Sequence, residues 1–262
     1  MNALSPIESA LGRFEATSPE RLATASLQDR GDTKFVLASD RLEAVLEAVR
    51  EHTTVVETNG RRSFSYRTVY FDTDDRRCYV DHQRGVRPRY KVRIREHQDR
   101  NVAFLEVKER GPGQVTHKIA RPCAPGLEEL DQESIDFIGG VCALDPRSLR
   151  PSATTAYTRS TLVASDRDER LTVDRDVHLV CGERAHTLSG IVTLELKQPR
   201  VTAVSPLFRT LRRAGVREVT FSKYCAAVAL LAGHERSRAY RETLNEIKRL
   251  GAVMPVDTLP AR

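Results

Sequence analysis

The chain has 262 residues, of which 40% are hydrophobic and 30% charged, and Lys and Arg outnumber Asp and Glu by 42 to 36, a formal net charge of +6. This composition indicates a folded, soluble and charge-rich protein, and the modest positive excess suits a partner that carries phosphate groups. The five cysteines form no CxxC pair and are odd in number. They argue against a cysteine-based zinc site and favour a reducing compartment.

Two features bear on the location of the protein. The first residues, MNALSPIESALGRFEA, contain no basic segment followed by an apolar one, so we expect no signal peptide. The longest apolar run, at 226–233, is far too short to span a bilayer. We therefore expect a cytoplasmic protein with no membrane segment of its own, while a membrane-bound partner protein stays open.

The first part of the chain is expected to pass from a polar arm into a sheet. Residues 1–30 are weakly patterned and predict an arm with a short helix. A strand at 33–38 precedes a helix at 39–52, which Ser39 or Asp40 can cap. Alternation between turn-prone residues then predicts five strands, at 63–72, 77–83, 89–97, 101–110 and 114–122.

The rest of the chain mixes helical and strand patterns. Helices are expected at 126–141, 205–215 and 222–233. Strands are expected at 154–165, 169–180 and 190–199. The tail at 234–262 is polar, partly helical at 238–250, and expected to be peripheral. About eight strands with few long helices predict an antiparallel barrel or sandwich with helices packed outside.

The stretch RYKVRIR, at 89–95, shows where charge lies on the predicted strands. Side chains alternate between the two faces of a strand, so Lys91, Arg93 and Arg95 share one face. Val92 and Ile94 share the other. Like charges on one face of a sheet repel, so these three cations need an anionic partner.

Three further strands repeat this parity, with charged residues opposite a largely apolar face: Glu106 and Lys108, Lys118, and Glu195 and Lys197. A weaker pattern places Arg159 on one face with Tyr157 and Thr161. A solvated outer face is the simplest interpretation of any single strand. However, cations dominate these faces, and the predicted helices cover the apolar ones. We therefore expect the charged faces to line the lumen of a closed barrel. Such a lumen repels itself unless a polyanion fills it, and Arg and Lys both suit phosphate chains.

Two glutamates lie among these cations. For Glu106, an internal salt bridge and a functional role stay equally open. Glu195 could hold Mn²⁺ or Mg²⁺ against phosphate oxygens, because these ions are usually held by one or two carboxylates plus the substrate. The spacing alone does not choose between the two roles.

Seven short motifs occur in an order typical of a known family: YFDT (70–73), KVRIR (91–95), FLEVK (104–108), YTR (157–159), RLTVD (170–174), LELK (194–197) and FSKY (221–224). With them, the chain resembles the VTC domain, the polyphosphate polymerase domain of the vacuolar transporter chaperone complex and its bacterial relatives. That domain is placed among the triphosphate tunnel metalloenzymes, also called the CYTH superfamily. The resemblance covers roughly residues 30–233.

The resemblance implies an α+β fold with one domain at 31–233, an eight-stranded antiparallel β-barrel with helices packed outside. In this tunnel the terminal phosphate of ATP would be transferred to a growing polyphosphate chain, with Mn²⁺ or Mg²⁺ as cofactor. The resemblance implies catalytic roles for Arg93, Arg95 and Lys223, and Glu195 as the metal ligand. The residues that it implies for substrate binding are Lys34, Lys91, Lys108, Lys118, Arg159, Arg170 and Lys197.

Two other functions stay open. Many hydrolases of the superfamily begin with Glu-x-Glu-x-Lys, whereas RGDTK at 30–34 keeps only Asp32, which weakens a triphosphatase or nucleotide hydrolase. A non-catalytic polyphosphate-binding module is the third interpretation. The expected ligands are ATP, polyphosphate or inorganic triphosphate. Nucleic acid is not expected, because stacking aromatic residues do not interleave with the cations.

Overall fold

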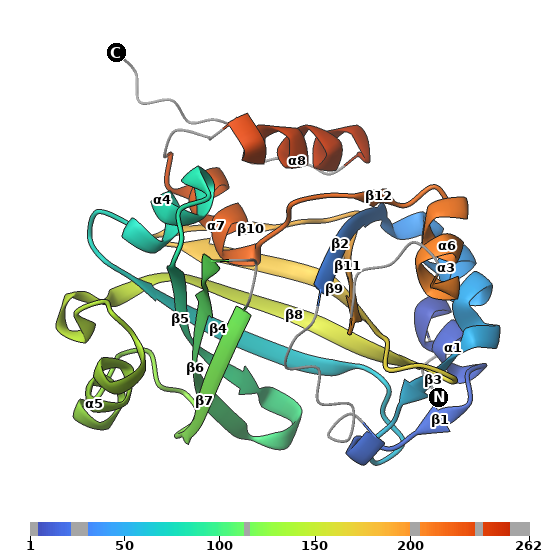
Figure 1. Ribbon diagram of the computed structural model, residues 1–262. Coiled ribbons are helices and arrows are strands. Elements are labelled where there is room, and N and C mark those ends of the chain that lie inside the picture. Colours follow the sequence, from blue (N-terminus) through green and yellow to red (C-terminus); the bar gives the residue numbers. More distant parts are fainter. Residues whose placement is uncertain (1–4, 22–30, 113–115, 200–204, 234–237, 252–262) are drawn as a thin grey trace.

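A curved antiparallel sheet forms the frame of the protein (Figure 1). The computed structural model describes residues 5–21, 31–112, 116–199, 205–233 and 238–251. Within them, the long strands are β2 (Gly31–Ala38), β4 (Phe64–Asp72), β5 (Arg89–His97), β6 (Val102–Arg110), β7 (Thr116–Cys123), β8 (Arg150–Ala164), β9 (Arg170–Cys181) and β11 (Ile191–Gln198). Short strands β1 (Ala16–Thr17), β3 (Thr53–Val56), β10 (Arg184–Thr187) and β12 (Arg217–Glu218) join them, and sequence patterns did not predict these four.

The sheet wraps around a common interior. Its strand order is β12-β2-β11-β9-β8-β4-β5-β6-β7, and the end strands β12 and β7 do not pair within the described residues. Even so, Lys108 Nζ on β6 lies 3.5 Å from Asp32 Oδ2 on β2, although these strands are second from opposite ends of the order. The α+β class is confirmed, and closure into an eight-stranded barrel stays a prediction.

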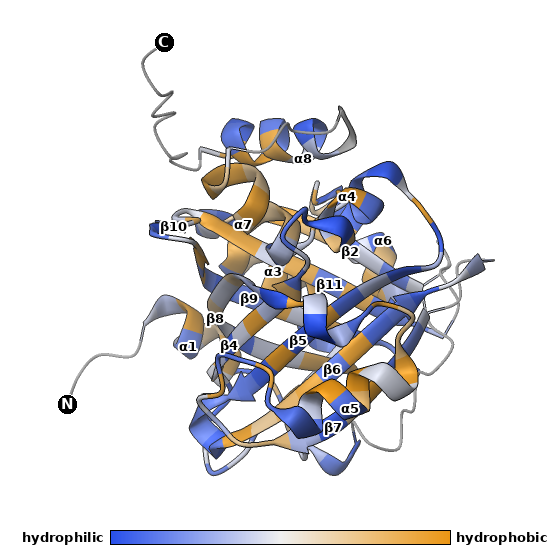
Figure 2. Cartoon of the chain, turned by 90° about the vertical axis from the view of Figure 1, so that its left-hand side faces the viewer, coloured by the Kyte–Doolittle hydropathy of each residue, from blue (hydrophilic) through white to orange (hydrophobic). Residues whose placement is uncertain are grey.

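Helices cover the outer face of the sheet, as the apolar stripes of the strands require. On one side, α1 (Pro6–Gly12), α3 (Leu42–Val49) and α6 (Pro206–Arg213) pack against β2, β9 and β11. On another, α5 (Gln132–Val141) covers β4, β5 and β6, where Val92 and Ile94 are buried. Figure 2 shows the alternation of hydrophobic and hydrophilic residues along β5 and β6. The side chains that alternate with these apolar residues therefore face the interior.

The helix α7 (Lys223–Leu231) departs from this arrangement, because it packs on the concave face. Its cluster contains Val36, Tyr70 and Tyr157, which lie on the inward parity of their strands. A bulge in β9 extends the apolar surface: Asp176 has a φ of 53°, and after it Val177 and Leu179 join the same cluster. This burial on all sides explains why α7 is hydrophobic from Cys225 to Leu231 (Figure 2).

The described part of the polar tail, which was expected to be peripheral, packs onto this apolar cluster through α8 (Arg238–Arg249). Tyr240, Leu244 and Ile247 are fully buried, and the Tyr240 hydroxyl donates to the carbonyl oxygen of Ser222 at 2.9 Å. Parts of the tail and of the amino-terminal arm, at 1–4, 22–30, 234–237 and 252–262, lie outside the described residues. The domain boundaries at 31 and 233 stay predictions.

The predicted strand at 77–83 is wrong, because this segment forms the helix α4 (Arg77–Arg84). The cause is a buried carboxylate before it: Asp72 is 1% exposed and accepts from the backbone N–H groups of Cys78 and Tyr79, at 2.8 and 3.0 Å. These are donors that the first turn of a helix leaves without a partner. The helix ends at Gly85, whose φ of 70° is left-handed. The predicted helix at 126–141 likewise begins only at Gln132, after the cap Asp131.

Asp72 also anchors α7, because the hydroxyl of Tyr224 donates to it. We expect Tyr224→Phe to lower the free energy of unfolding by about 1–3 kcal/mol, since a buried acceptor then loses a donor. Urea unfolding measures this change. Tyr90→Phe, at a half-buried tyrosine of β5, is the matched control and should change it by less than about 0.5 kcal/mol. Equal effects of the two substitutions would show that the hydrogen bond from Tyr224 to Asp72 does not contribute to the free energy of unfolding.

Candidate functional site

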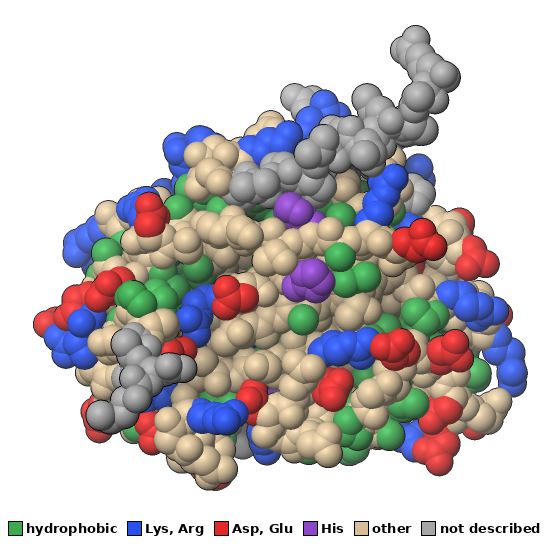
Figure 3. All heavy atoms as spheres, turned by 180° about the vertical axis from the view of Figure 1, so that it is seen from behind, with side chains coloured by type: hydrophobic (Ala, Val, Ile, Leu, Met, Phe, Trp, Pro, Cys, Tyr) green, Lys and Arg blue, Asp and Glu red, His purple; other side chains and the backbone are tan. Residues whose placement is uncertain are grey.

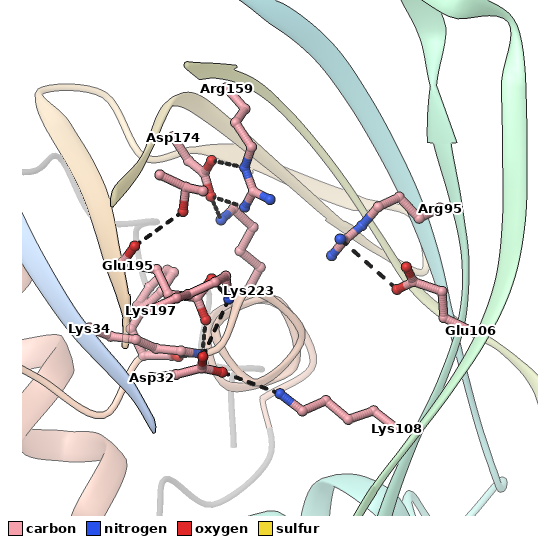
Figure 4. Close-up of polar contacts among 12 residues, drawn as sticks. Asp32, Lys34, Arg95, Glu106, Lys108, Arg159, Asp174, Glu195, Lys197 and Lys223 are labelled. Atoms are coloured by element: carbon pink, nitrogen blue, oxygen red, sulfur yellow. Dashed lines mark hydrogen bonds and ion pairs between the residues drawn. The ribbon is translucent and has the colours of Figure 1, made fainter. Parts of the chain in front are cut away.

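The inward faces of the strands enclose a cavity of about 360 Å³. All eleven residues proposed from the sequence lie in its wall: Lys34, Lys91, Arg93, Arg95, Lys108, Lys118, Arg159, Arg170, Glu195, Lys197 and Lys223. They come from seven strands and from the first residue of α7. Figure 4 shows Lys34, Glu195 and Lys197 facing Arg95 and Glu106 across the interior. The structure thus brings the residues together, and their chemical roles stay predictions.

Glu106 is the centre of an ion-pair group on β5, β6 and β7. Its side chain is 7% exposed, its Oε2 accepts from Arg93 Nε at 2.7 Å, and its Oε1 accepts from Lys118 Nζ at 3.2 Å. Burial opposes ionisation, but the charges of Arg93, Arg95 and Lys118 outweigh it and hold the pKa of Glu106 well below its ordinary value. Of the two roles open for Glu106, the geometry therefore matches an internal salt bridge.

Asp174 forms a second group, which the sequence analysis did not single out. Its carboxylate accepts from Arg159 Nε at 2.6 Å and from Arg159 Nη2 at 2.8 Å, and it also accepts from Lys223. Although burial raises the pKa of Asp174, Arg159 and Lys223 outweigh this effect and lower it to about 2. The Lys223 ammonium also lies 4.3 Å from the ring centroid of Tyr157, a cation–π contact. Strand parity could have found Asp174, since it shares a face with Arg170.

Glu195 and Asp32 form the third group, on the neighbouring strands β11 and β2. Lys197 Nζ lies between them, 2.9 Å from Glu195 Oε2 and 3.5 Å from Asp32 Oδ1. Lys34 Nζ is 3.9 Å from Glu195 Oε1. Burial disfavours the charged form of Glu195, yet Lys197 and Lys34 keep its pKa well below the ordinary value. Each wall carboxylate is therefore ionised and shared between cations.

The oxygen ligands of this third group suit a hard divalent cation. Glu195 and Asp32 both contact the Lys197 ammonium, so the two carboxylates lie on the same part of the cavity from neighbouring strands. No group of three or more His, Cys, Asp or Glu side chains in the described part of the chain is placed to hold a metal ion. The residues thus fit an ion that takes most of its ligands from phosphate and water, as Mg²⁺ usually does.

The cavity wall carries a large excess of positive charge. Ten Lys and Arg side chains line it, against the three carboxylates of Glu106, Asp174 and Glu195. His97, also in the wall, adds no charge near neutral pH, because burial and the charge of Arg95 lower its pKa to about 4. Arg95 Nε is buried without a hydrogen-bond partner among the described residues. The wall therefore keeps an excess of positive charge that an anionic ligand could neutralise.

A second cavity, of about 320 Å³, adjoins the first, because Lys34, Lys91 and Lys108 line both. It adds Arg89 and Arg110 to the basic wall. We call the two adjoining cavities the passage. Basic side chains therefore line both parts of the passage.

Lys91, at the junction of the two cavities, gives the passage a measurable pH dependence. Its ammonium donates to Ser222 Oγ at 3.1 Å, and burial, together with the charges of Lys34 and Lys108, lowers the pKa of Lys91 to about 7. Above that pH the free side chain is mostly neutral, and a bound phosphate chain raises its pKa again. We therefore expect triphosphate binding to take up protons at about pH 8, and the affinity to fall as the pH rises further.

Calorimetry in two buffers of different ionisation enthalpy measures this uptake. Lys91→Met should take up fewer protons than the wild type, by up to about one per ligand. Lys248→Met, at an exposed lysine of α8, should match the wild type. Equal uptake by the wild type and Lys91→Met would contradict the assignment of the proton to Lys91.

A comparison with known families matches residues 29–232 to the VTC domain. The chain belongs to the VTC domain family. The match confirms the resemblance carried by the seven sequence motifs, and every residue of the cavity wall lies within it. A search of curated proteins gives no match to this VTC domain protein.

Solved structures similar to this VTC domain share little sequence with it. A putative adenylate cyclase from Bacillus halodurans is 13% identical, with a TM-score of 0.47, and the match covers 74% of this chain and 95% of that one. A conserved hypothetical protein from Pyrococcus furiosus is 15% identical, with a TM-score of 0.41, and the match covers 72% of this chain and 91% of that one. A putative adenylyl cyclase from Hippeastrum is 14% identical, with a TM-score of 0.46, and the match covers 76% of this chain and 94% of that one. That protein is described as having a dominant triphosphatase activity. The family assignment rests on the VTC domain match alone.

None of the described helices of this VTC domain protein is long and apolar enough to cross a membrane. A cytoplasmic location and a membrane-bound partner protein both stay predictions.

Proposed function

We propose that this VTC-family protein is a polyphosphate polymerase, which transfers the terminal phosphate of ATP to the end of a polyphosphate chain held in the passage. The main support is the wall charge: ten cations against three carboxylates, each already shared between cations. Such a wall needs a multiply charged anion to neutralise it. The functional unit of this proposal is 31–233, and its ligands are ATP and polyphosphate or inorganic triphosphate.

The wall residues can perform this reaction by position and charge. Phosphoryl transfer asks a protein mainly to align the reacting groups and to stabilise the charge on the equatorial oxygens. In the proposal, Arg93, Arg95 and Lys223 bind these oxygens from two sides of the cavity, and Lys223 adds the N-terminus of α7. The remaining cations hold the donor and the acceptor chain.

A divalent ion at Glu195, Mn²⁺ or Mg²⁺, would when bound neutralise part of the charge on the phosphate oxygens. The protein's own residues need not supply a nucleophile, because the nucleophile is the terminal phosphate of the polyphosphate chain. That phosphate is largely ionised near neutral pH, since the second pKa of a phosphoryl group is about 6. The protein therefore needs no general base.

A tunnel hydrolase would instead have to activate water. The carboxylate best placed for this is Asp32, which precedes Lys34 on β2, but Lys108 and Lys197 both lie 3.5 Å from it. Each of its two oxygens already contacts an ammonium group, so a water molecule would have to displace one of these lysines to reach the carboxylate. This contact favours transfer to a phosphate chain over transfer to water.

Product analysis separates the three functions. The purified chain is incubated with ATP and Mn²⁺ or Mg²⁺, and the products are resolved by gel electrophoresis and phosphorus NMR. Polyphosphate with an equivalent amount of ADP is the result that we expect. Orthophosphate without chains would assign a hydrolase, and tight polyphosphate binding without turnover would assign a binding module; either result overturns the proposal. The Arg95→Gln variant, purified in the same way, controls for contaminating enzymes.

A further inference from the structure

Two aromatic side chains lie together at one end of the first cavity. Tyr66 on β4 and His97 on β5 both line this cavity, pair directly in the register of the two strands, and have ring centroids 4.4 Å apart. We call Tyr66 and His97 the aromatic end. Lys91, which lines both cavities, precedes His97 by six residues on β5. The aromatic end therefore lies about 20 Å along the strand from the junction of the two cavities.

The aromatic end differs in exposure from the other aromatic groups of the cavity wall. Tyr70, Tyr157 and Phe221 also line the cavity, but each is at most 5% exposed. Tyr66 and His97 are instead half-buried. Part of each ring therefore remains accessible to a ligand in the cavity.

The rings are held in place before a ligand arrives. Tyr66 stacks on Tyr157 of β8, with centroids 5.4 Å apart and ring planes 2° apart, and Phe104 of β6 lies beside His97 at 6.1 Å. A ring that is fixed in advance loses little conformational freedom on binding. The planes of Tyr66 and His97 are tilted by 57°, so these two rings do not cover each other fully.

The polar atoms of the aromatic end carry no charge near neutral pH. Burial and the charge of Arg95 lower the pKa of His97 to about 4, and burial raises the pKa of Tyr66 above its ordinary value. In the described part of the chain, neither the ring nitrogens of His97 nor the hydroxyl of Tyr66 make a hydrogen bond to another residue. A neutral imidazole offers one donor and one acceptor. Such groups do not neutralise phosphate, so they suit an uncharged part of the ligand.

The aromatic end lies next to the residues that bind the transferred phosphate in the proposed reaction. Arg95 and Arg93 precede His97 on the same face of β5, in steps of two residues or about 6.6 Å. In ATP a ribose separates the base from the first phosphate, so a base at His97 places the phosphates beside these arginines in turn. On the outer face shown in Figure 3, by contrast, Lys and Arg are mixed with Asp and Glu.

We propose that Tyr66 and His97 form the subsite for the base of the donor nucleotide, and that they set the orientation of ATP in the passage. This inference rests on the proposed function, because it takes ATP as the donor. Aromatic side chains bind bases by stacking, which tolerates different bases because every base has a π-face. The triphosphate then runs along β5 towards Lys91, and the acceptor chain occupies the second cavity. The passage thus has a nucleoside end and a polyphosphate end.

The test compares the binding of ATP and of inorganic triphosphate by calorimetry without metal, which excludes the proposed metal-dependent turnover. His97→Ala should raise the Kd for ATP about 10-fold, since loss of one stacked base is typically worth that much, and should leave the Kd for inorganic triphosphate unchanged. His97→Phe keeps a ring that stacks and should retain most of the affinity for ATP. The matched control is His117→Ala, at an exposed histidine of β7 that lines neither cavity, and it should behave as the wild type.

An unchanged Kd for ATP in His97→Ala would overturn the inference, because the base would then lie elsewhere. An equal rise for ATP and inorganic triphosphate would overturn it too, since His97 would then only support the fold. The same holds for an equal loss in His97→Phe or in the control, and for a wild type that binds triphosphate but not ATP.

The assay also separates this inference from the proposed function, because it measures binding alone. A protein that binds ATP without making polyphosphate still shows the selective loss in His97→Ala. A polymerase that holds the base elsewhere makes polyphosphate and shows no such loss.

Discussion

The Glu195→Gln variant is expected to lose metal-dependent turnover by about 100-fold or more. A divalent ion contributes several kcal/mol of charge stabilisation in the transition state, and each 1.36 kcal/mol corresponds to a factor of about ten in rate. Triphosphate binding without metal should be unchanged or tighter, because the substitution removes a negative charge beside Lys34 and Lys197. Turnover with Mn²⁺ and calorimetry without metal measure the two effects.

This pattern separates a metal ligand from a structural residue. A purely structural Glu195 would lower the melting temperature and the affinity together. The matched control is Glu128→Gln, at an exposed carboxylate that pairs with Arg67 outside the cavity, and it should behave as the wild type. Retained activity in Glu195→Gln would remove this residue from the mechanism.

The second large effect is expected at Arg95, whose Nε is buried without a partner in the described chain and whose Nη1 lies 4.0 Å from Glu106. Because little of the protein depends on it, Arg95→Gln should lower kcat/KM for ATP by about 100-fold at an unchanged melting temperature. A charge-assisted contact to a transferring phosphoryl group is typically worth that much. Steady-state kinetics and thermal unfolding measure the two quantities.

Arg93 is the informative comparison, because it has the same charge on the same strand face. Its Nε bonds directly to Glu106, so Arg93→Gln should lower activity and also the free energy of unfolding, by about 1–3 kcal/mol. Lys118 remains as a partner of Glu106 and limits the loss. An equal loss of stability in the two variants would mean that Arg95, too, serves the fold.

Eight of the eleven proposed residues of the cavity wall could be predicted from strand parity, because parity is a local property, whereas Lys34, Arg170 and Lys223 came from the family resemblance alone. Lys91, Arg93 and Arg95 alternate with Val92 and Ile94, and a backbone of period two places the two sets on opposite faces whatever the rest of the fold does. Once one residue of a strand is assigned to a face, the alternation assigns the other residues of that strand. The alternation alone does not say which face points inward. The helices decide this, because the apolar face of β5 packs against α5.

What could not be predicted depends on contacts between distant segments. The helix α4 looked like a strand, because its start is stabilised by Asp72, which precedes it in a buried turn. The helix at 222–233 was expected outside, yet the bulge at Asp176 turns an apolar part of β9 inward to receive it. The roles of Glu106 and Asp174 follow from cross-strand register, which single-strand patterns do not contain.

The sharing of each wall carboxylate between cations has a consequence for movement along the passage. Glu106, Asp174 and Glu195 each contact at least two cations, so a phosphate can take one cation while the carboxylate keeps another. The phosphate can thus replace the contacts of a carboxylate one at a time, so that no buried charge is left without a partner. For a ligand that repeats the same anionic unit, successive registers are then nearly equal in energy. Under the proposed function, a growing chain could then advance by one unit after each addition without a large net change in energy.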